Sequence, residues 1–447
     1  MKRRWWATAT MVAFAFSGVA AARDLEEILK DKGILTDEEA KEVKRSAAAE
    51  PSPAASAAAA LPEWLAKVTP FGDVRVRNES FFRKDDPDRV RQRFRLRFGA
   101  KVKVNDETEL GFRLATGQTG ELISNNQTLT DTFTFKDFNV SNAYLKVAPA
   151  KSLGWSRPWL TLTAGKFDVP LYNPPTITGL VFDRDLTPEG GAETIKLIEE
   201  KEGLVRGAGL NFGQWVFKES SKTGDGAIFA FQGFANLAPG DRLLWNVGAG
   251  DYLFQKESTI AQARNSNTSM VTTNSVVLSD GTVVGGRPID PAKEGTDENG
   301  EPLAIIGYAG GFNVVNAGTD LTYDTGVPAW PVRGFVDFAH NTDAVTGEDT
   351  GYELGGEVGS AKEPLDLLFR YAWEHLETDA VVSAFSESDY GADGGTNTEG
   401  HILQASVVLL KNLTLLSTAY FTEPIDEVEG RSTDTSTRWQ VDLIGKF

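Results

Sequence analysis

Cationic side chains alternate with apolar side chains over residues 90–104. The cations stand at the odd-numbered positions, Arg91, Arg93, Arg95, Arg97, Lys101 and Lys103. The even-numbered positions hold the apolar residues Phe94, Leu96, Phe98, Ala100, Val102 and Val104. A period of two is typical of a β-strand, whose successive side chains point to opposite faces. The sequence therefore predicts a strand with one oily face and one face that carries a row of positive charge.

A row of like charges is costly on a water-soluble sheet, because neighbouring cations on one face repel each other. In a membrane β-barrel the apolar face contacts lipid and the charged face lines a wet lumen, so the same pattern is tolerated. Two nearby segments repeat it, with Arg75 and Arg77 next to valines and Arg113 between Phe112 and Leu114. We therefore predict a set of channel-lining cations: Arg75, Arg77, Arg91, Arg93, Arg95, Arg97, Lys101, Lys103 and Arg113. The alternative is the exposed basic edge of a soluble β-sandwich.

The composition excludes several classes of protein. Among 447 residues, 41% are hydrophobic, and no apolar run beyond the N-terminus reaches the roughly 18 residues that a membrane-spanning helix needs. Cysteine is absent, which rules out disulfides and thiolate chemistry. The net charge of -18 disfavours nucleic acid as a partner. Acidic residues gather between the candidate strands, at 290–301 and 379–399.

The first 66 residues differ from the rest of the chain. Residues 1–22 have a basic start, an apolar centre and small residues at the end, which is the pattern of a secretory signal peptide. Residues 23–46 are predicted to form a short periplasmic helical segment, either a module that associates with copies of itself or the cell wall, or a poorly ordered arm. Residues 47–66, rich in alanine and proline, are predicted to be a linker.

Residues 67–447 are predicted to form one all-β domain, a transmembrane antiparallel β-barrel. Alternating segments separated by turn residues predict sixteen strands, at 71–81, 90–104, 108–116, 138–148, 159–167, 203–210, 214–220, 227–235, 243–255, 312–323, 331–341, 352–361, 365–378, 401–410, 413–422 and 437–447. With this count the short connections, including residues 211–213, fall on the periplasmic side and the long loops fall outside. The alternatives are fourteen or eighteen strands.

The last predicted strand places Trp439, Val441 and Leu443 on one face and ends on Phe447. Trp439 and Phe447 are far enough apart to lie near the two membrane interfaces, where aromatic girdles occur. A terminal phenylalanine on an alternating strand also resembles the signal that the outer-membrane assembly machinery recognises. We therefore expect this machinery to be a partner.

Several motifs of the chain stand out: Lys32-Gly33-Ile34-Leu35-Thr36-Asp37-Glu38-Glu39-Ala40, Arg93-Phe94-Arg95-Leu96-Arg97, Gly111-Phe112-Arg113-Leu114-Ala115-Thr116-Gly117, Asn126-Gln127-Thr128-Leu129, Gly165-Lys166-Phe167 before Pro170, Asp183-Arg184-Asp185-Leu186-Thr187-Pro188-Glu189-Gly190 and Asp337-Phe338-Ala339-His340-Asn341-Thr342-Asp343. With these motifs the chain resembles the bacterial outer-membrane "putative porin" family and, more distantly, phosphate-selective porins. The chain departs from the family pattern at residues 211–220 and in a long insertion at 256–303.

The resemblance implies an outer-membrane channel of a Gram-negative bacterium that lets small polar or anionic solutes diffuse passively, with lipid and lipopolysaccharide around it. It also implies a homotrimer and an external loop, residues 168–202, that folds inward as a constriction. We expect the acidic side chains of this loop to face the basic wall across the lumen: Asp168, Asp183, Asp185, Glu189 and Glu193. The alternatives are a solute-specific channel and a barrel that mainly tethers the envelope through its N-terminal segment.

We expect no enzyme activity, no catalytic residue, no metal site and no cofactor. A barrel hydrolase would need a serine or aspartate with a partnering histidine. His340, His375 and His401 are few and widely spaced in the sequence.

Overall fold

The computed structural model describes residues 65–447, except 85–86, 131, 172–178, 222–223, 268, 392–393 and 430–433. The predicted signal peptide, the helical segment and the linker up to residue 64 lie outside the described residues. None of the helices in the described part of the chain is long and apolar enough to cross a lipid bilayer.

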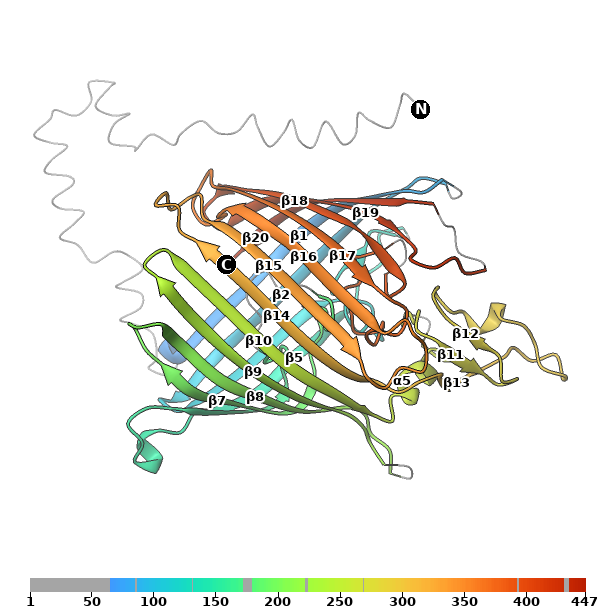
Figure 1. Ribbon diagram of the computed structural model, residues 1–447, viewed down its shortest axis with the longest axis horizontal. Coiled ribbons are helices and arrows are strands. Elements are labelled where there is room, and N and C mark those ends of the chain that lie inside the picture. Colours follow the sequence, from blue (N-terminus) through green and yellow to red (C-terminus); the bar gives the residue numbers. More distant parts are fainter. Residues whose placement is uncertain are drawn as a thin grey trace, which may run out of the picture. The chain divides into compact units, whose positions relative to one another are not determined.

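Sixteen antiparallel strands of the described chain close into a barrel (Figure 1). They are β1 Val68–Phe82, β2 Arg89–Asn105, β3 Thr108–Thr116, β5 Phe138–Val147, β6 Leu160–Lys166, β7 Glu189–Glu199, β8 Val205–Lys218, β9 Gly226–Gly240, β10 Leu243–Gln255, β14 Asn313–Tyr323, β15 Val332–Asn341, β16 Thr350–Gly359, β17 Leu367–Leu376, β18 Thr398–Leu410, β19 Leu413–Glu423 and β20 Ser436–Lys446. Each strand pairs with its neighbours in the sequence, and β1 also pairs with β20. The prediction of a sixteen-stranded barrel is therefore confirmed.

The two faces of β1 and β2 separate by parity as predicted. Val74 and Phe98 are 43% and 41% exposed on the outer face, whereas Asp73 and Arg95 are buried on the inner face. Exposed apolar side chains continue around the outer face on β15 to β18. An apolar outer belt of this kind is stable in contact with hydrocarbon, and the inward residues of such a barrel can be polar.

The two ends of the barrel differ. At one end, which we call the short-turn end, the strands are joined by short connections such as 106–107, 241–242 and 411–412. At the other, the long-loop end, the connections include 117–137, 167–188, 256–312 and 377–397. In outer-membrane barrels the short turns are periplasmic and the long loops are external.

The predicted hairpin at 203–220 is wrong, because these residues form the single strand β8. Asn211 and Gly213 gave the signal of a turn, but Asn211 bonds to Gln232 on the next strand. Gly213 leaves room for a ring, since a Cβ there would lie 2.6 Å from the indole of Trp215. The predicted external loop 168–202 is also wrong in extent, because it contains β7. The two errors cancel in the strand count.

The long loops carry a hydrophobic core inside and above the barrel. Leu180 of the 167–188 loop and Val381 of the 377–397 loop are fully buried in one cluster with the wall residues Trp215 and Tyr252. The 256–312 loop adds helix α5 Ser258–Ala263 and a small sheet of β11 Val276–Leu278, β12 Val283–Val284 and β13 Ile305–Tyr308, drawn in yellow in Figure 1.

The remaining described elements are short. Strand β4 Gln127–Thr128 pairs with β2 beyond the point where β3 ends. The 3-10 helices are η1 Leu65–Lys67, η2 Lys151–Leu153 and η3 Pro291–Lys293.

A charge placed on the outer face should destabilise the barrel. Val76 is exposed near the middle of β1, and Val76→Arg should cost about 2–4 kcal/mol of unfolding free energy if it lies at the bilayer midplane. The control Gln404→Arg makes the same side chain on the inner face of β18 and should cost less. Urea unfolding in lipid vesicles measures both, and equal losses would contradict this orientation of the two faces.

Candidate functional site: the barrel interior

The inner faces of β1, β2 and β3 carry the seven predicted arginines. The register pairs Arg75 with Arg95 and Arg77 with Arg93 across β1 and β2. Guanidinium groups placed this closely repel one another and are costly to remove from water unless anions lie between them. The positions of the nearby carboxylates therefore decide how much positive charge the lumen presents.

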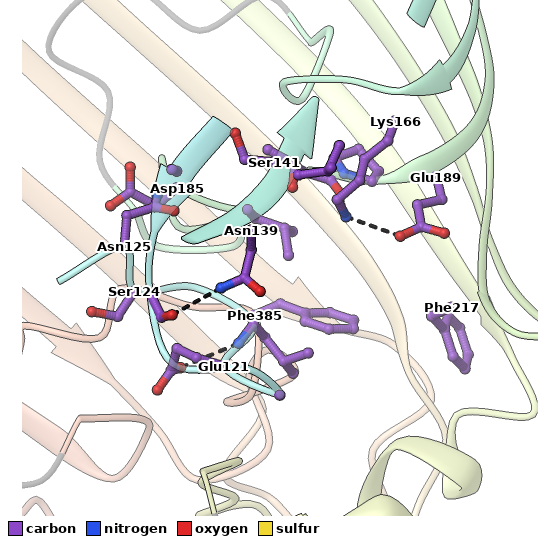
Figure 2. A pocket seen from close by; sticks show the side chains of 18 of the residues that line it. Glu121, Ser124, Asn125, Asn139, Ser141, Lys166, Asp185, Glu189, Phe217 and Phe385 are labelled. Atoms are coloured by element: carbon purple, nitrogen blue, oxygen red, sulfur yellow. Dashed lines mark hydrogen bonds and ion pairs between the residues drawn. The ribbon is translucent and has the colours of Figure 1, made fainter. Parts of the chain in front are cut away.

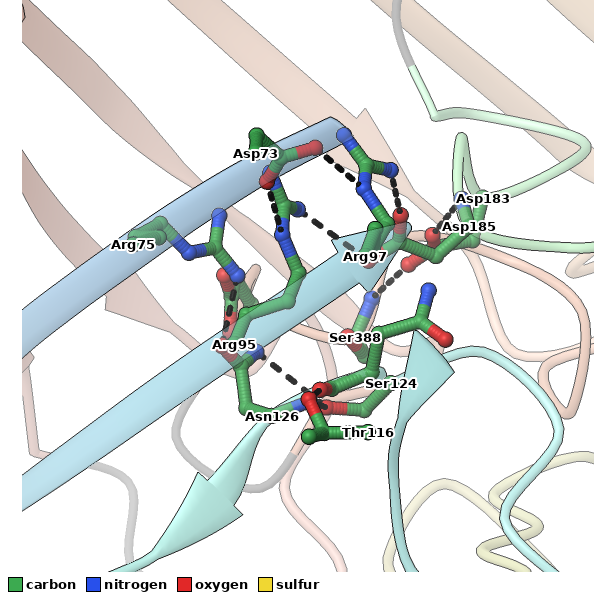
Figure 3. Close-up of polar contacts among 12 residues, drawn as sticks. Asp73, Arg75, Arg95, Arg97, Thr116, Ser124, Asn126, Asp183, Asp185 and Ser388 are labelled. Atoms are coloured by element: carbon green, nitrogen blue, oxygen red, sulfur yellow. Dashed lines mark hydrogen bonds and ion pairs between the residues drawn. The ribbon is translucent and has the colours of Figure 1, made fainter. Parts of the chain in front are cut away.

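Asp73 lies on the inner face of β1 between Arg95 and Arg97 (Figure 3). Its Oδ1 accepts a hydrogen bond of 2.8 Å from Arg95 Nη2, and its Oδ2 accepts one of 2.6 Å from Arg97 Nε. Asp185 of the 167–188 loop is the second anion, with Oδ1 3.2 Å from Arg97 Nη1 and Oδ2 3.8 Å from Arg95 Nη1. Two wall arginines thus hold this loop against the wall.

A second cluster lies higher on the same wall. Glu79 is fully buried, accepts a hydrogen bond from Arg91, and has Oε1 3.2 Å from Nε of Arg438 on β20. Arg77 donates to both oxygens of Asp442 at 2.7 and 2.8 Å.

Asp389 of the 377–397 loop joins this cluster and accepts a hydrogen bond of 2.6 Å from Arg77 Nη1. Burial opposes the ionisation of Asp389, but Arg77 and Arg438 outweigh it and hold the pKa of this carboxyl below its usual value. A second loop is therefore fixed to the wall by a charged contact.

The other three arginines contact loop residues or an aspartate. Arg75 Nη2 donates to Asn126 Oδ1 at 2.6 Å, and Arg93 Nη2 donates to Ser124 Oγ at 3.3 Å. Arg113 Nη2 lies 2.8 Å from Asp168 Oδ1. All seven predicted arginines therefore have a polar or anionic partner, and the row is not a bare positive face.

The predicted lysines differ from the arginines. Lys101 and Lys103 follow the arginines on β2 toward the short-turn end, and Lys146 lies on the inner face of β5. Among the described residues, no carboxylate oxygen comes within 4.0 Å of any of these three ammonium groups. Lys101 and Lys146 line a hollow of about 510 Å³ that Arg113 and Asp168 also line.

The five acidic residues predicted for a constriction loop divide into two groups. Asp168, Asp183 and Asp185 lie in the 167–188 loop and inside the barrel. Burial, with Glu387 and Asp185 nearby, raises the pKa of Asp183 well above its usual value. Asp183 accepts hydrogen bonds from the backbone N–H groups of Asp185 and Ser388, at 2.7 and 3.1 Å (Figure 3).

Glu189 and Glu193 belong to β7, so the prediction that they lie in a loop is wrong. Glu189 forms an ion pair of 3.0 Å with Lys166, at the edge of a hollow also lined by Phe217 and Phe385 (Figure 2). Glu193 accepts a hydrogen bond of 3.0 Å from Gln214. The register with β8 places Glu193 opposite Phe212, which is on the outer face.

An acidic wall lies opposite the arginines and was not predicted from the sequence. Strands β14 to β17 carry buried carboxylates on their inner face: Asp320, Asp337, Glu353 and Glu374. Arg333 Nε donates to Asp320 at 3.0 Å, and Arg370 donates to Glu353. Asp337 between Val336 and Phe338 gives the same period-two signal as the arginines, so parity could have found this wall.

The three histidines lie on the outer face of β15, β17 and β18. His340 is near Asp349 at 3.2 Å, His375 is near Glu399 at 2.8 Å, and His401 is near the hydroxyl of Tyr371 at 3.0 Å. Within the described part of the chain, no three histidine or acidic side chains are arranged to hold a metal ion.

Comparisons with known proteins concern most of the barrel. A family model described as "Putative porin" matches residues 81–325 and 313–447. No curated protein sequence matches the chain. The solved structure of Pseudomonas putida OprB is similar, with 12% identity and a TM-score of 0.52 over 86% of this chain and 96% of that chain.

Two further solved structures are similar to the chain. An anion-selective porin from Comamonas acidovorans has 14% identity and a TM-score of 0.47 over 85% of this chain and 99% of that chain. OmpF of Salmonella typhi has 11% identity and a TM-score of 0.46, over 85% and 97%.

Removal of the Asp185 carboxylate should leave Arg95 and Arg97 with less neutralising charge. Two unit charges at 4 Å interact by about 1 kcal/mol in water, so Asp185→Asn should raise the anion-to-cation permeability ratio roughly two- to fivefold. The control Glu199→Gln removes the carboxylate of an exposed pair with Lys196 on β7. Reversal potentials under a salt gradient in planar bilayers measure the ratio. A shift of equal size in both variants would contradict a local effect on the wall.

Proposed function

Because the chain belongs to the "Putative porin" family, we propose that it forms a water-filled channel for the passive diffusion of small hydrophilic solutes and ions. Members of this family lie in the outer membrane of Gram-negative bacteria. The observation that carries the proposal is the parity of the closed barrel, with an apolar outer face and charged or amide side chains inside. A barrel of sixteen strands leaves room for an aqueous lumen.

The field across the lumen is the proposed basis of solute orientation. Arginines crowd the wall formed by β20, β1, β2 and β3, and carboxylates crowd the wall formed by β14 to β17. The 167–188 loop lies between the two walls. On one side its Asp185 pairs with Arg97 of the basic wall, and on the other its exposed Arg184 lines the same hollow as Asp337 of the acidic wall. A dipolar solute that passes such a pair of walls is turned by the field.

We assign the anion preference to the lysines rather than to the arginines. The arginines are already matched by carboxylates or bonded to polar side chains, whereas Lys101, Lys103 and Lys146 have no carboxylate within 4.0 Å among the described residues. Unpaired cations at a pore mouth raise the local concentration of anions. The preference should therefore be modest and should weaken as salt screens the lysines.

Neutralising the lysines should test this assignment. The triple variant Lys101→Gln, Lys103→Gln and Lys146→Gln should move the reversal potential toward cation preference, with the largest shift at low salt. The control Lys411→Gln removes a lysine from the turn between β18 and β19 at the same end of the barrel. A wild-type channel that already prefers cations would contradict the proposed anion preference.

We also propose self-assembly, as a homotrimer, through the side of the barrel formed by β5 to β8. Strand β6 has seven residues, fewer than the roughly 9–11 that span the hydrocarbon core. The outer face there carries the Lys166–Glu189 pair, and Glu193 lies between Leu162 and Phe212. Charges are unfavourable against lipid, so a protein surface is the better neighbour for this short wall.

Two fully exposed aromatic side chains support the same proposal. Phe133 and Phe135, in the loop between β3 and β5, are 101% and 105% exposed. Side chains of this size are seldom left in water and are common at protein interfaces. We assign them to a contact with a second copy of the chain.

Polar replacement of these aromatics should weaken the assembly. Phe133→Ser with Phe135→Ser should lower the temperature at which the oligomer dissociates in detergent, without changing the unfolding of the barrel itself. The control Leu365→Ser replaces an exposed apolar residue in a turn at the short-turn end. Electrophoresis of heated and unheated samples measures dissociation, and a wild-type protein that migrates as a monomer would contradict the proposal.

A further inference from the structure

A row of neutral hydrogen-bonding groups crosses the inner wall from β7 to β14. The cross-strand partners in this row are Thr194, Asn211, Gln232, Gly250 and Asn316. Thr194 Oγ1 donates to Asn211 Oδ1 at 2.9 Å, and Asn211 Nδ2 donates to Gln232 Oε1 at 3.0 Å. This sector of the wall lies between the basic and the acidic sectors and carries almost no charge of its own.

The glycine in the row makes room for a tyrosine. A Cβ on Gly250 would lie 2.8 Å from the hydroxyl oxygen of Tyr252, the next inward residue of β10. The phenol of Tyr252 therefore reaches over Gly250, between Gln232 and Asn316. Its ring makes an edge contact with Phe182 of the 167–188 loop, with centroids 5.1 Å apart.

A second amide row runs closer to the short-turn end. Asn236 Nδ2 donates to Asn246 Oδ1 at 2.8 Å, and Asn246 Nδ2 donates to Asp320 Oδ1 at 3.1 Å. Between the two rows Gly248 and Gly318 are cross-strand partners, so the wall has no side chains at these two positions. A hollow of about 200 Å³ lies there, lined by both glycines, Gln232, Tyr252, Asn316 and Asp337, with Phe182 and Arg184 from the loop.

The charges around this hollow are matched with other groups, and Arg184 interacts with the carboxylates of Glu353 and Glu357. Asp168 pairs with Arg113, and Asp337 accepts a hydrogen bond of 2.8 Å from Asn316 Nδ2. Asp183 accepts two backbone N–H groups. An ion entering the hollow would lose water and find no unmatched opposite charge, which is unfavourable.

We propose that this hollow is a binding subsite for uncharged, hydroxyl-rich solutes of the size of a monosaccharide or polyol. The inference rests on the proposed channel function, and adds to it the class of solute that the channel favours. Hydroxyl groups donate and accept together, and the tyrosine hydroxyl offers both roles. The N–H groups of Asn316 are bonded to Asp337 and to the carbonyl of Phe338, so its Oδ1 is the atom that can accept a hydrogen bond from a solute. The C–H surfaces of a sugar ring can pack on Tyr252 and Phe182.

The size of the hollow agrees with this class of solute. At about 200 Å³ the hollow has room for several water molecules. A small ring that replaces them keeps most of their hydrogen bonds through its hydroxyls. A channel requires that such a site bind its solute weakly enough to release it.

The first test fills the hollow. Gly318 lies inside β14, where valine is favourable for a strand, and Gly318→Val places a side chain on the inner wall at the floor of the hollow. In proteoliposome swelling assays, uptake of glucose and sorbitol should fall several-fold, while the conductance in potassium chloride keeps more than half of its value. The control Gly334→Val makes the same change on the outer face of β15, where a Cβ meets no atom within 4 Å, and should leave both unchanged.

The second test removes hydrogen bonds without filling space. Asn316→Leu should lower glucose uptake as well. If Gly318→Val does not assemble, the result with Asn316→Leu tests the subsite. Two results would overturn the subsite alone. One is that the wild type takes up glucose no faster than gluconate and glucosamine. The other is that sugar uptake is unchanged in both variants while their conductance is intact. Absence of any conductance in the wild type would overturn the channel function itself.

Discussion

The neutralisation of guanidinium groups that point into a closed barrel is the constraint on which the interior depends. Those side chains cannot turn outward, because their strand neighbours must contact lipid. The strands supply Asp73, Glu79 and Asp442, and the long loops supply Asp168, Asp185 and Asp389. Removing one partner of a buried ion pair typically costs about 3–5 kcal/mol, so these loops are held inside by charge as well as by packing. The positions of these loops inside the barrel follow from the charge of the wall.

Three sectors of different chemistry result around the lumen. The basic sector spans β20 to β3, the acidic sector spans β14 to β17, and the amide sector spans β7 to β14. The apolar residues Leu180 and Val381 fix the two inserted loops beside the amide sector, where Trp215 and Tyr252 offer aromatic surface. Each loop thus has an apolar contact on one side of the lumen and a charged contact on the other, which defines its position across the pore.

The sequence predicted the barrel well, because parity is a local signal that every strand repeats. Arg93 inward and Phe94 outward could be read from three neighbouring residues. Strand β7 was not predicted, because Glu189, Glu193 and Glu199 made it resemble a solvated loop. Charges on an outer face break the alternation of apolar and polar residues that marks a barrel strand. The split of β8 arose because Asn211 and Gly213 give a turn signal in any sequence, and only the neighbouring strand and Trp215 explain them. The contacts of Asp185 with Arg97 and of Asp389 with Arg77 join residues far apart in the chain, and no spacing rule encodes them.

The pairing of β1 with β20 has a consequence for biogenesis. Phe447 exchanges two backbone hydrogen bonds of 3.0 Å with Gly72, and its ring stacks on Phe98. The seam of the cylinder therefore joins the beginning and the end of the domain, and loop-closure entropy makes so remote a contact slow to form. Until β20 pairs with β1, each of these two strands has an unpaired edge that can associate with other chains. Closure of the cylinder at this seam therefore removes the last two exposed edges of the sheet.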